Sequence, residues 1–124
     1  MRSKFKRTAP TKPSFTQAGL KGYTFPTETD GIQISVENVT RGHDRYATEL
    51  KTTTIYYVVD GEGTFRVDDE EFTVAVGDLV EILPGTEFVF AGKMQLILIH
   101  LPGFQKEFNV VGRPNDLYDK EGRR

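Results

Sequence analysis

The sequence predicts an all-β domain, either a small barrel or a sandwich. Three observations support this fold class. Between residues 32 and 101, apolar residues mostly alternate with polar ones or form short continuous runs, as they do in strands. Glycines and prolines separate these runs at short intervals. No segment of this region has the 3.6-residue period of a long amphipathic helix.

Two kinds of apolar pattern predict the first strands. Residues 32–36 alternate Ile, Ile and Val with polar residues, which indicates a half-buried strand. Residues 55–59 form a continuous β-branched and aromatic run, which is typical of a strand covered on both faces. The Asp-Gly-Glu-Gly sequence at 60–63 then predicts a turn, because glycine tolerates positive φ angles.

Short strands and turns alternate through the rest of this region. The expected turns contain Asp-Asp-Glu, Gly-Asp, Pro-Gly and Ala-Gly-Lys sequences, at residues 68–70, 77–78, 84–85 and 91–93. The expected strands between them are residues 64–67, 72–76, 79–83, 86–90 and 94–101.

Both ends of the chain differ from the middle. Residues 1–13 are rich in Lys, Arg and Pro, so we expect a disordered basic N-terminal tail. We expect the barrel at residues 14–111, with a core at 32–104 and an arm or edge strand at 14–25. Residues 112–124 are expected to form a polar C-terminal tail.

Composition limits the classes of partner and location. The chain of 124 residues has the length of one domain, and it can bury a core without disulfides. Cysteine is absent, which excludes thiolate metal sites and suits the cytoplasmic location that we expect. The formal net charge of −2 gives no case for a nucleic-acid partner. No apolar run approaches the length of a membrane span, so we expect no membrane partner.

The glycine spacing resembles the first conserved motif of the cupin superfamily. That motif runs Gly-x5-His-x-His, then three or four residues, then Glu-x6-Gly. Gly42 and Gly61 stand at its two glycines, and every spacing between them fits. The three positions that carry metal ligands in cupins are occupied by Thr48, Leu50 and Thr54.

The second cupin motif is present in the same altered form. It runs Gly-x5-Pro-x-Gly-x2-His-x3-Asn, and Gly77 and Gly85 fit its glycines. Phe88 stands at the His position and Gly92 at the Asn position. The resemblance covers residues 32–104 and implies a double-stranded β-helix, a jelly-roll barrel open at one end. Cupins commonly dimerise, so it also implies a homodimer, to which the arm at residues 14–25 would contribute.

The substitutions argue against the metal site that the resemblance would otherwise imply. Cupins bind Mn, Fe, Ni or Zn through imidazoles and a carboxylate, which suit these ions. Leucine and phenylalanine cannot donate to a metal, so we expect no metal and no other cofactor. One alternative stays open. His43, Glu49 and His100 would form a site if a one-residue slip turned Glu49 inward, although we expect His43 to be solvent-exposed in the loop after Gly42.

Strand alternation predicts what lines the barrel in place of the metal ligands. We expect an apolar and aromatic wall with a few hydroxyls and one imidazole, which suits a small organic ligand. Tyr56, Phe88 and Phe90 are equally compatible with a filled core, because small barrels are often filled by side chains. The candidate ligand-binding residues are Thr48, Leu50, Thr54, Tyr56, Phe88, Phe90 and His100.

Three functions follow as hypotheses. The first is a metal-independent cupin barrel that binds a small polar metabolite, with sugar-like compounds as one candidate class. The second is a metal-free isomerase or epimerase, with His100 and Tyr56 as candidate catalytic residues for proton transfer. The third is a regulatory or structural dimer without catalysis.

Overall fold

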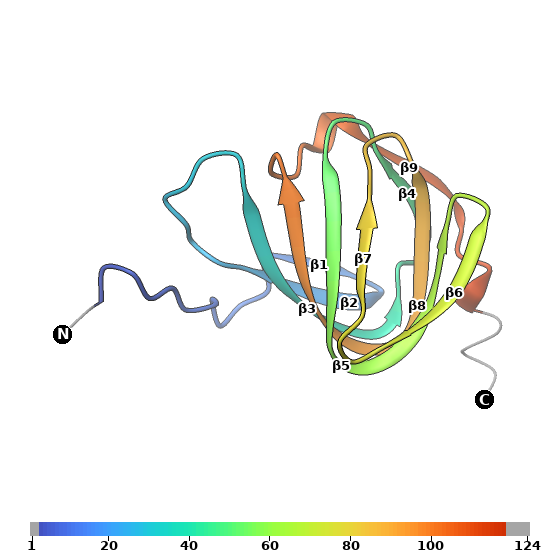
Figure 1. Cartoon of the computed structure of the whole chain (residues 1–124), viewed down its shortest axis with the longest axis horizontal. Helices are drawn as coiled ribbons and strands as arrows, with labels where there is room; N and C mark the ends of the chain where they lie inside the picture. The colour runs from blue at the N-terminus through green and yellow to red at the C-terminus, as the bar shows by residue number, and fades with distance from the viewer. Residues whose placement is uncertain (1–2, 119–124) are drawn as a thin grey trace.

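The computed structural model describes residues 3–118, which are almost entirely β-structure, as the sequence predicts. The strands of the described residues form one nine-stranded sheet, in which the order of strands differs from their order along the chain. This sheet curls into a barrel (Figure 1). The strands are β1 Phe15–Gln17, β2 Gly19–Thr24, β3 Gln33–Gly42, β4 Arg45–Glu49, β5 Thr53–Val67, β6 Glu70–Ala75, β7 Leu79–Ile82, β8 Glu87–Leu101 and β9 Asn109–Pro114, with a short 3-10 helix, η1, at Lys106–Phe108.

Strands β5 and β8 are the longest, with 15 residues each, and they form the centre of the sheet. They pair antiparallel from Thr53 opposite Leu101 to Val67 opposite Phe88. The other edge of β8 pairs with β4 near Phe88 and with β3 from Ala91 to His100. β5 also pairs with β7 through residues 54–57 and with β6 through residues 62–67.

Two glycines of the first motif permit close approaches between strands. Gly42 has φ 128° and Gly61 has φ 82°, a region that L-residues rarely adopt. A Cβ atom on Gly42 would collide with the carbonyl oxygen of Phe90, and one on Gly61 would collide with that of Lys93. Both positions therefore require glycine, because the backbones of β3 and β5 pass very close to the backbone of β8 there.

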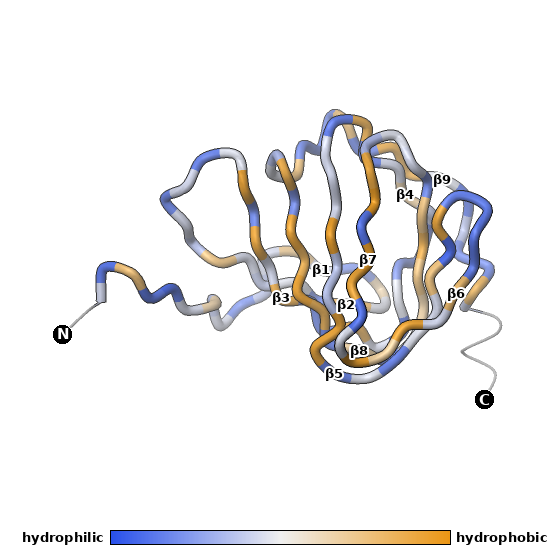
Figure 2. Tube along the Cα trace, viewed as in Figure 1, coloured by the Kyte–Doolittle hydropathy of each residue, from blue (hydrophilic) through white to orange (hydrophobic). Residues whose placement is uncertain are grey.

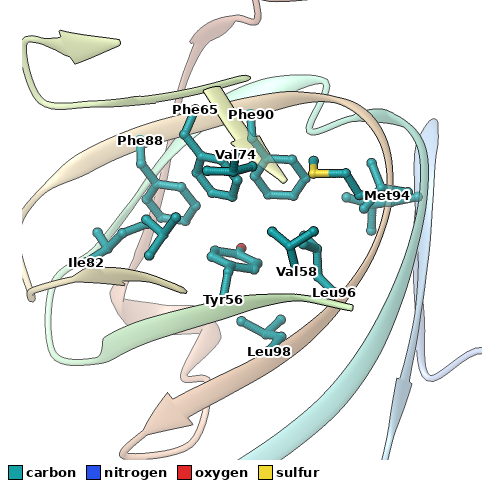
Figure 3. Packing of buried hydrophobic residues seen from close by; sticks show 13 residues of the cluster. Tyr56, Val58, Phe65, Val74, Ile82, Phe88, Phe90, Met94, Leu96 and Leu98 are labelled. Carbon is teal, nitrogen blue, oxygen red and sulfur yellow. The ribbon is translucent and has the colours of Figure 1, made fainter. Parts of the chain in front are cut away.

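The main core lies inside the curled sheet. Figure 3 shows Tyr56 and Val58 of β5 facing the rings of Phe65, Phe88 and Phe90, with Leu96 and Leu98 of β8 beside them. The Tyr56 ring meets Phe88 and Phe90 edge-on, with centroids 6.0 and 5.2 Å away. In contrast to this apolar core, the β5–β6 turn is hydrophilic (Figure 2), and Asp68, Asp69 and Glu70 are exposed there.

A second, smaller core lies on the other face of β4. Tyr46 is buried there against Val89, Ala91 and Leu117. The Tyr46 hydroxyl donates to Asp116 Oδ1 at 2.6 Å, and Arg66 also bonds to Asp116 at 2.7 Å. The segment after β9 is thus attached to the barrel by apolar and polar contacts.

These contacts bear on the boundaries expected at the ends of the chain. β9 crosses the boundary expected at residue 111, and Leu117 is buried, so residues 112–118 are part of the packed domain. Residues 119–124 of the expected C-terminal tail, and residues 1–2 of the N-terminal one, lie outside the described residues. Residues 3–13 form no strand and are mostly exposed. Among residues 3–118, no helix is long and apolar enough to cross a membrane.

We predict that Leu96→Ala lowers the free energy of unfolding by about 3 kcal/mol, because it leaves a cavity in the main core. Leu96 is fully buried, whereas Leu101 on the same strand is 40% exposed. Leu101→Ala is therefore the matched control, with an expected loss below about 1 kcal/mol. Urea denaturation measures both values. Equal losses would contradict the assignment of the core.

Candidate ligand-binding site

A cavity of about 530 Å³ lies between β3, β4, β8 and β9, with Tyr56 of β5 in its wall. Its lining combines aromatic and aliphatic side chains with two histidines and two glutamates. The lining residues are Ser14, Phe15, Gln17, Thr24, Gln33, Glu37, His43, Asp44, Arg45, Tyr46, Ala47, Glu49, Tyr56, Phe88, Leu98, His100, Phe104, Asn109 and Val111.

The register of β8 with β3 and β5 determines which side chains form one wall of this cavity. His100 on β8 lies opposite Gln33 of β3 on one side and Thr54 of β5 on the other. Two residues earlier on β8, Leu98 lies opposite Tyr56 of β5. Because alternate residues share a face, His100 and Tyr56 both point into the barrel. Both are buried, as the sequence predicts for these two positions.

His43 also lies in the cavity, so the expectation that it is solvent-exposed is wrong. Its ring packs on Phe90 with centroids 4.4 Å apart, and on Phe88 at 5.6 Å. Its backbone N–H donates to the carbonyl of Phe90 at 3.2 Å. The buried Asn115 side chain donates to the carbonyls of His43 and Phe90, at 2.7 and 2.9 Å. The C-terminal segment therefore fixes the position of this imidazole.

Strand β4 presents the opposite face from the one that the motif spacing suggested. Leu50 is 47% exposed, so its expected place in the barrel is wrong. Glu49 is buried and lines the cavity, while Thr48 does not line it. The reason is that Tyr46 is buried in the second core, and alternation from Tyr46 puts Thr48 on the same outer face.

Two other predicted residues are buried beside the cavity and are not part of its lining. Thr54 is buried, and its Oγ1 has no hydrogen-bond partner among the described residues. Phe90 belongs to the main core and supports the His43 ring. Tyr56, Phe88 and His100 therefore line the cavity, whereas Thr48, Leu50, Thr54 and Phe90 do not.

Sequence analysis missed Glu37 entirely. It lies on β3, its side chain is 1% exposed, and it lines the cavity. The alternation of residues 32–36 predicts a strand but does not say which face turns inward. In the structure the polar residues Ser35 and Glu37 are buried and Ile34 and Val36 are half-buried, so the polar face forms the wall.

Burial changes the ionisation of the groups in the cavity. It lowers the pKa of His43 to about 4, with a further contribution from His100, and it lowers the pKa of His100 to about 4. It raises the pKa of Glu37 to about 8 and that of Glu49 to about 7. The pKa of Tyr56 rises well above its usual value, through burial and then through both glutamates. At neutral pH the cavity thus holds neutral imidazoles beside a protonated carboxyl.

The alternative metal site is only partly supported by this geometry. His43, Glu49 and His100 do line one cavity, and Glu49 does point inward. However, within residues 3–118 no three His, Cys, Asp or Glu side chains are grouped closely enough to hold a metal ion.

Comparison with known proteins agrees with the fold and with the glycine motifs. The family model described as the Cupin domain matches residues 50–100. The matched segment is less than half of the chain and agrees with the cupin-like fold of the structure. The all-β jelly-roll barrel is confirmed by solved structures of the same fold. No curated protein matches the chain.

Among solved structures, this chain is similar to Pac13, a nucleoside dehydratase. The two chains share 24% sequence identity with a TM-score of 0.81, over 90% of this chain and 93% of Pac13. A Tyr-to-Phe variant of Streptomyces PAC13 with uridine also matches, with 24% identity and a TM-score of 0.84 over 96% and 98% of the two chains. KdgF from Halomonas sp. matches with 15% identity and a TM-score of 0.67, over 77% and 89%.

We predict that His100→Gln makes stability less sensitive to acid. Between pH 6.5 and 4, the unfolded chain takes up protons on both histidines while the folded chain does not, so these groups destabilise the fold as pH falls. Glu37 and Glu49 act in the opposite sense, because the folded chain keeps their protons to higher pH. His100→Gln removes one destabilising contribution and leaves the glutamates unchanged.

Urea denaturation at pH 6.5 and 4 measures the effect. The free energy of unfolding should fall less in the variant than in the wild type. Equal falls in both proteins would show that His100 titrates normally.

Proposed function

We propose that the cavity binds a small, uncharged, sugar-like metabolite, with a nucleoside as the first candidate. The observation that carries this proposal is the cavity of about 530 Å³, in which His43, Tyr56 and His100 face an otherwise largely apolar wall. A few convergent polar groups on an apolar wall are typical of small-molecule sites, and this volume is within their usual range.

The likeness to Pac13 supports the choice of a nucleoside. Pac13 is a nucleoside dehydratase, and its variants with uridine share the fold over almost the whole of this chain. The shared fold does not by itself transfer the ligand. The cavity adds its own argument, because Phe88 and Phe104 offer faces for a flat ring while His43 and Glu37 offer hydrogen bonds to hydroxyls or carbonyls.

The neutral state of the two imidazoles favours an uncharged ligand. A phosphate or carboxylate needs a cation beside it when it is buried. The cation in the lining, Arg45, is exposed and donates to the carbonyl of Gly112 at 2.7 Å. The proposed ligand therefore carries hydroxyls and carbonyls and no anionic group in the inner cavity.

A second candidate function is acid–base catalysis on the same ligand class. His43 and His100 are neutral at pH 7 and able to accept a proton, while Glu37 still holds one. Groups whose environments separate their pKa values in this way suit a proton acceptor and a proton donor. In a dehydration, the base takes a proton from a C–H bond, a C=C bond forms, and the acid protonates the departing hydroxyl, so that water leaves. An isomerisation uses the same two groups without loss of water.

Homodimer formation remains a prediction. The outer face of β5 and β7 supports it, because Tyr57 and Leu79 lie opposite each other there and are both exposed. Val59 and Val76 are also exposed. We propose that a second copy packs on this apolar surface.

We predict that uridine binds to the wild-type protein and that Tyr56→Phe weakens this binding by roughly 2- to 10-fold, through loss of one hydrogen bond. Tyr57→Phe is the matched control, because Tyr57 is the next residue on β5, points outward and is 41% exposed. Isothermal titration calorimetry measures the dissociation constants, with other nucleosides and free sugars as additional probes. No binding of any of these probes at millimolar concentration would contradict the proposed function.

For the catalytic candidate, we predict that His43→Gln and His100→Gln reduce turnover at least 100-fold while changing the dissociation constant much less. The test substrates are sugars and nucleosides with a carbonyl group, which acidifies the neighbouring C–H bond. NMR detects dehydration and isomerisation products. A wild-type protein that binds these compounds and leaves them unchanged would restrict the function to binding.

A further inference from the structure

Glu37 is the most unusual side chain in the cavity wall. It lies near the middle of β3 and is 1% exposed, and its Oε1 has no hydrogen-bond partner among residues 3–118. Buried carboxyl groups in proteins nearly always have a partner, because an unsatisfied one destabilises the fold. A carboxyl group that lines a cavity with one buried, unpartnered oxygen therefore suggests that the partner is a ligand.

The neighbouring strands show why the protein itself supplies no partner. On β8, Leu96 lies opposite Glu37, and on β2 the opposite residue is Gly22, which has no side chain. The ring of Phe15 fills the space beside Gly22, so that β1 also contributes an apolar group. Glu37 thus has apolar neighbours on three strands, and its carboxyl group lines the cavity.

We propose that Glu37 is a specificity-determining residue that donates a hydrogen bond from its protonated carboxyl to an uncharged acceptor, a carbonyl or hydroxyl oxygen, on the bound ligand. This proposal rests on the proposed function and adds a chemical requirement to it. The ligand must place an acceptor against the β3 wall. It must also lack a negative charge there, since an anion would face both a carboxyl group and two neutral imidazoles.

Other titratable groups face the same space from the elements around Glu37. They are Tyr56 on β5, His100 on β8, His43 after β3 and Glu49 on β4. Burial holds the pKa of Glu37 at about 8, above that of Glu49 at about 7, while both histidines have a pKa of about 4. Above pH 7.5, therefore, Glu37 is the main group of this set that loses a proton. Glu49 is by then largely ionised, and both histidines are already neutral.

The experiment compares three variants by calorimetric titration with uridine and by thermal unfolding. Glu37→Gln keeps the shape and a hydrogen-bond donor but cannot ionise. Glu37→Leu removes the donor and fits the apolar surroundings. Glu81→Gln is the control, because Glu81 is an exposed glutamate on β7, a strand that does not pair with β3.

We expect wild-type affinity for uridine to fall about 3-fold between pH 7.5 and 8.5, as Glu37 loses its proton while the uracil ring stays largely neutral. Glu37→Gln should bind at pH 7.5 and lose most of this pH dependence, whereas Glu81→Gln should behave like the wild type. Glu37→Leu should bind about tenfold more weakly at pH 7.5, yet unfold at a temperature higher by on the order of 4 °C, because it removes an unsatisfied buried group. A gain in stability with a loss of binding separates a ligand contact from a structural role.

The outcomes separate this proposal from the proposed function. If the wild type binds and Glu37→Leu binds equally well, the role of Glu37 is overturned while ligand binding stands. The same holds if Glu37→Gln keeps the full pH dependence. If the wild type binds neither uridine nor any other nucleoside or sugar, the proposed function fails and the role of Glu37 fails with it.

Discussion

The pairing of β8 with three other strands determines where the cavity lies. Along one edge, β8 pairs with β5 from Phe88 to Leu101. Along its other edge, it pairs first with β4 and then with β3, and the change occurs where Gly42 crosses Ala91. β3 and β4 thus follow one another along this edge of β8, and both contribute residues to the cavity. His43 follows Gly42 directly, so the same crossing that closes the barrel also places an imidazole inside it.

The C-terminal segment has a larger role than its polar composition suggests. Asn115 donates to the carbonyls of His43 and Phe90, and Leu117 covers Tyr46. The burial of Tyr46 on the outer face of β4 obliges Glu49 to face inward. Two of the titratable groups in the cavity thus owe their positions to residues 115–118, none of which lines the cavity.

The fold could be predicted from local signals, and about half of the site could not. Gly42 and Gly61 have the positive φ angles that their motif positions require, and the alternating runs lie in strands. The turns expected at residues 60–63 and 91–93 are wrong, because β5 and β8 continue through them and their glycines allow the two backbones to pass closely. The inward direction of Tyr56 and His100 followed from alternation within long, regular strands. The face of β4 that turns inward could not be predicted in this way. It depends on the packing of Tyr46 against Leu117, a contact that residue spacing alone does not reveal. Glu37 was missed for a related reason. A glutamate in an alternating strand is normally assigned to the solvent face, and only the register with β8 turns it inward.

The proposed binding site is the space enclosed by β3, β4 and β8, where an uncharged, sugar-like ligand contacts Glu37. A crystal structure of the protein grown with uridine at pH 6.5 is the decisive measurement. We expect uridine inside the cavity, against Tyr56 and His43, with a carbonyl or hydroxyl oxygen within hydrogen-bond distance of the Glu37 carboxyl. Uridine on the outer surface, or a cavity closed by rearranged side chains, would contradict it.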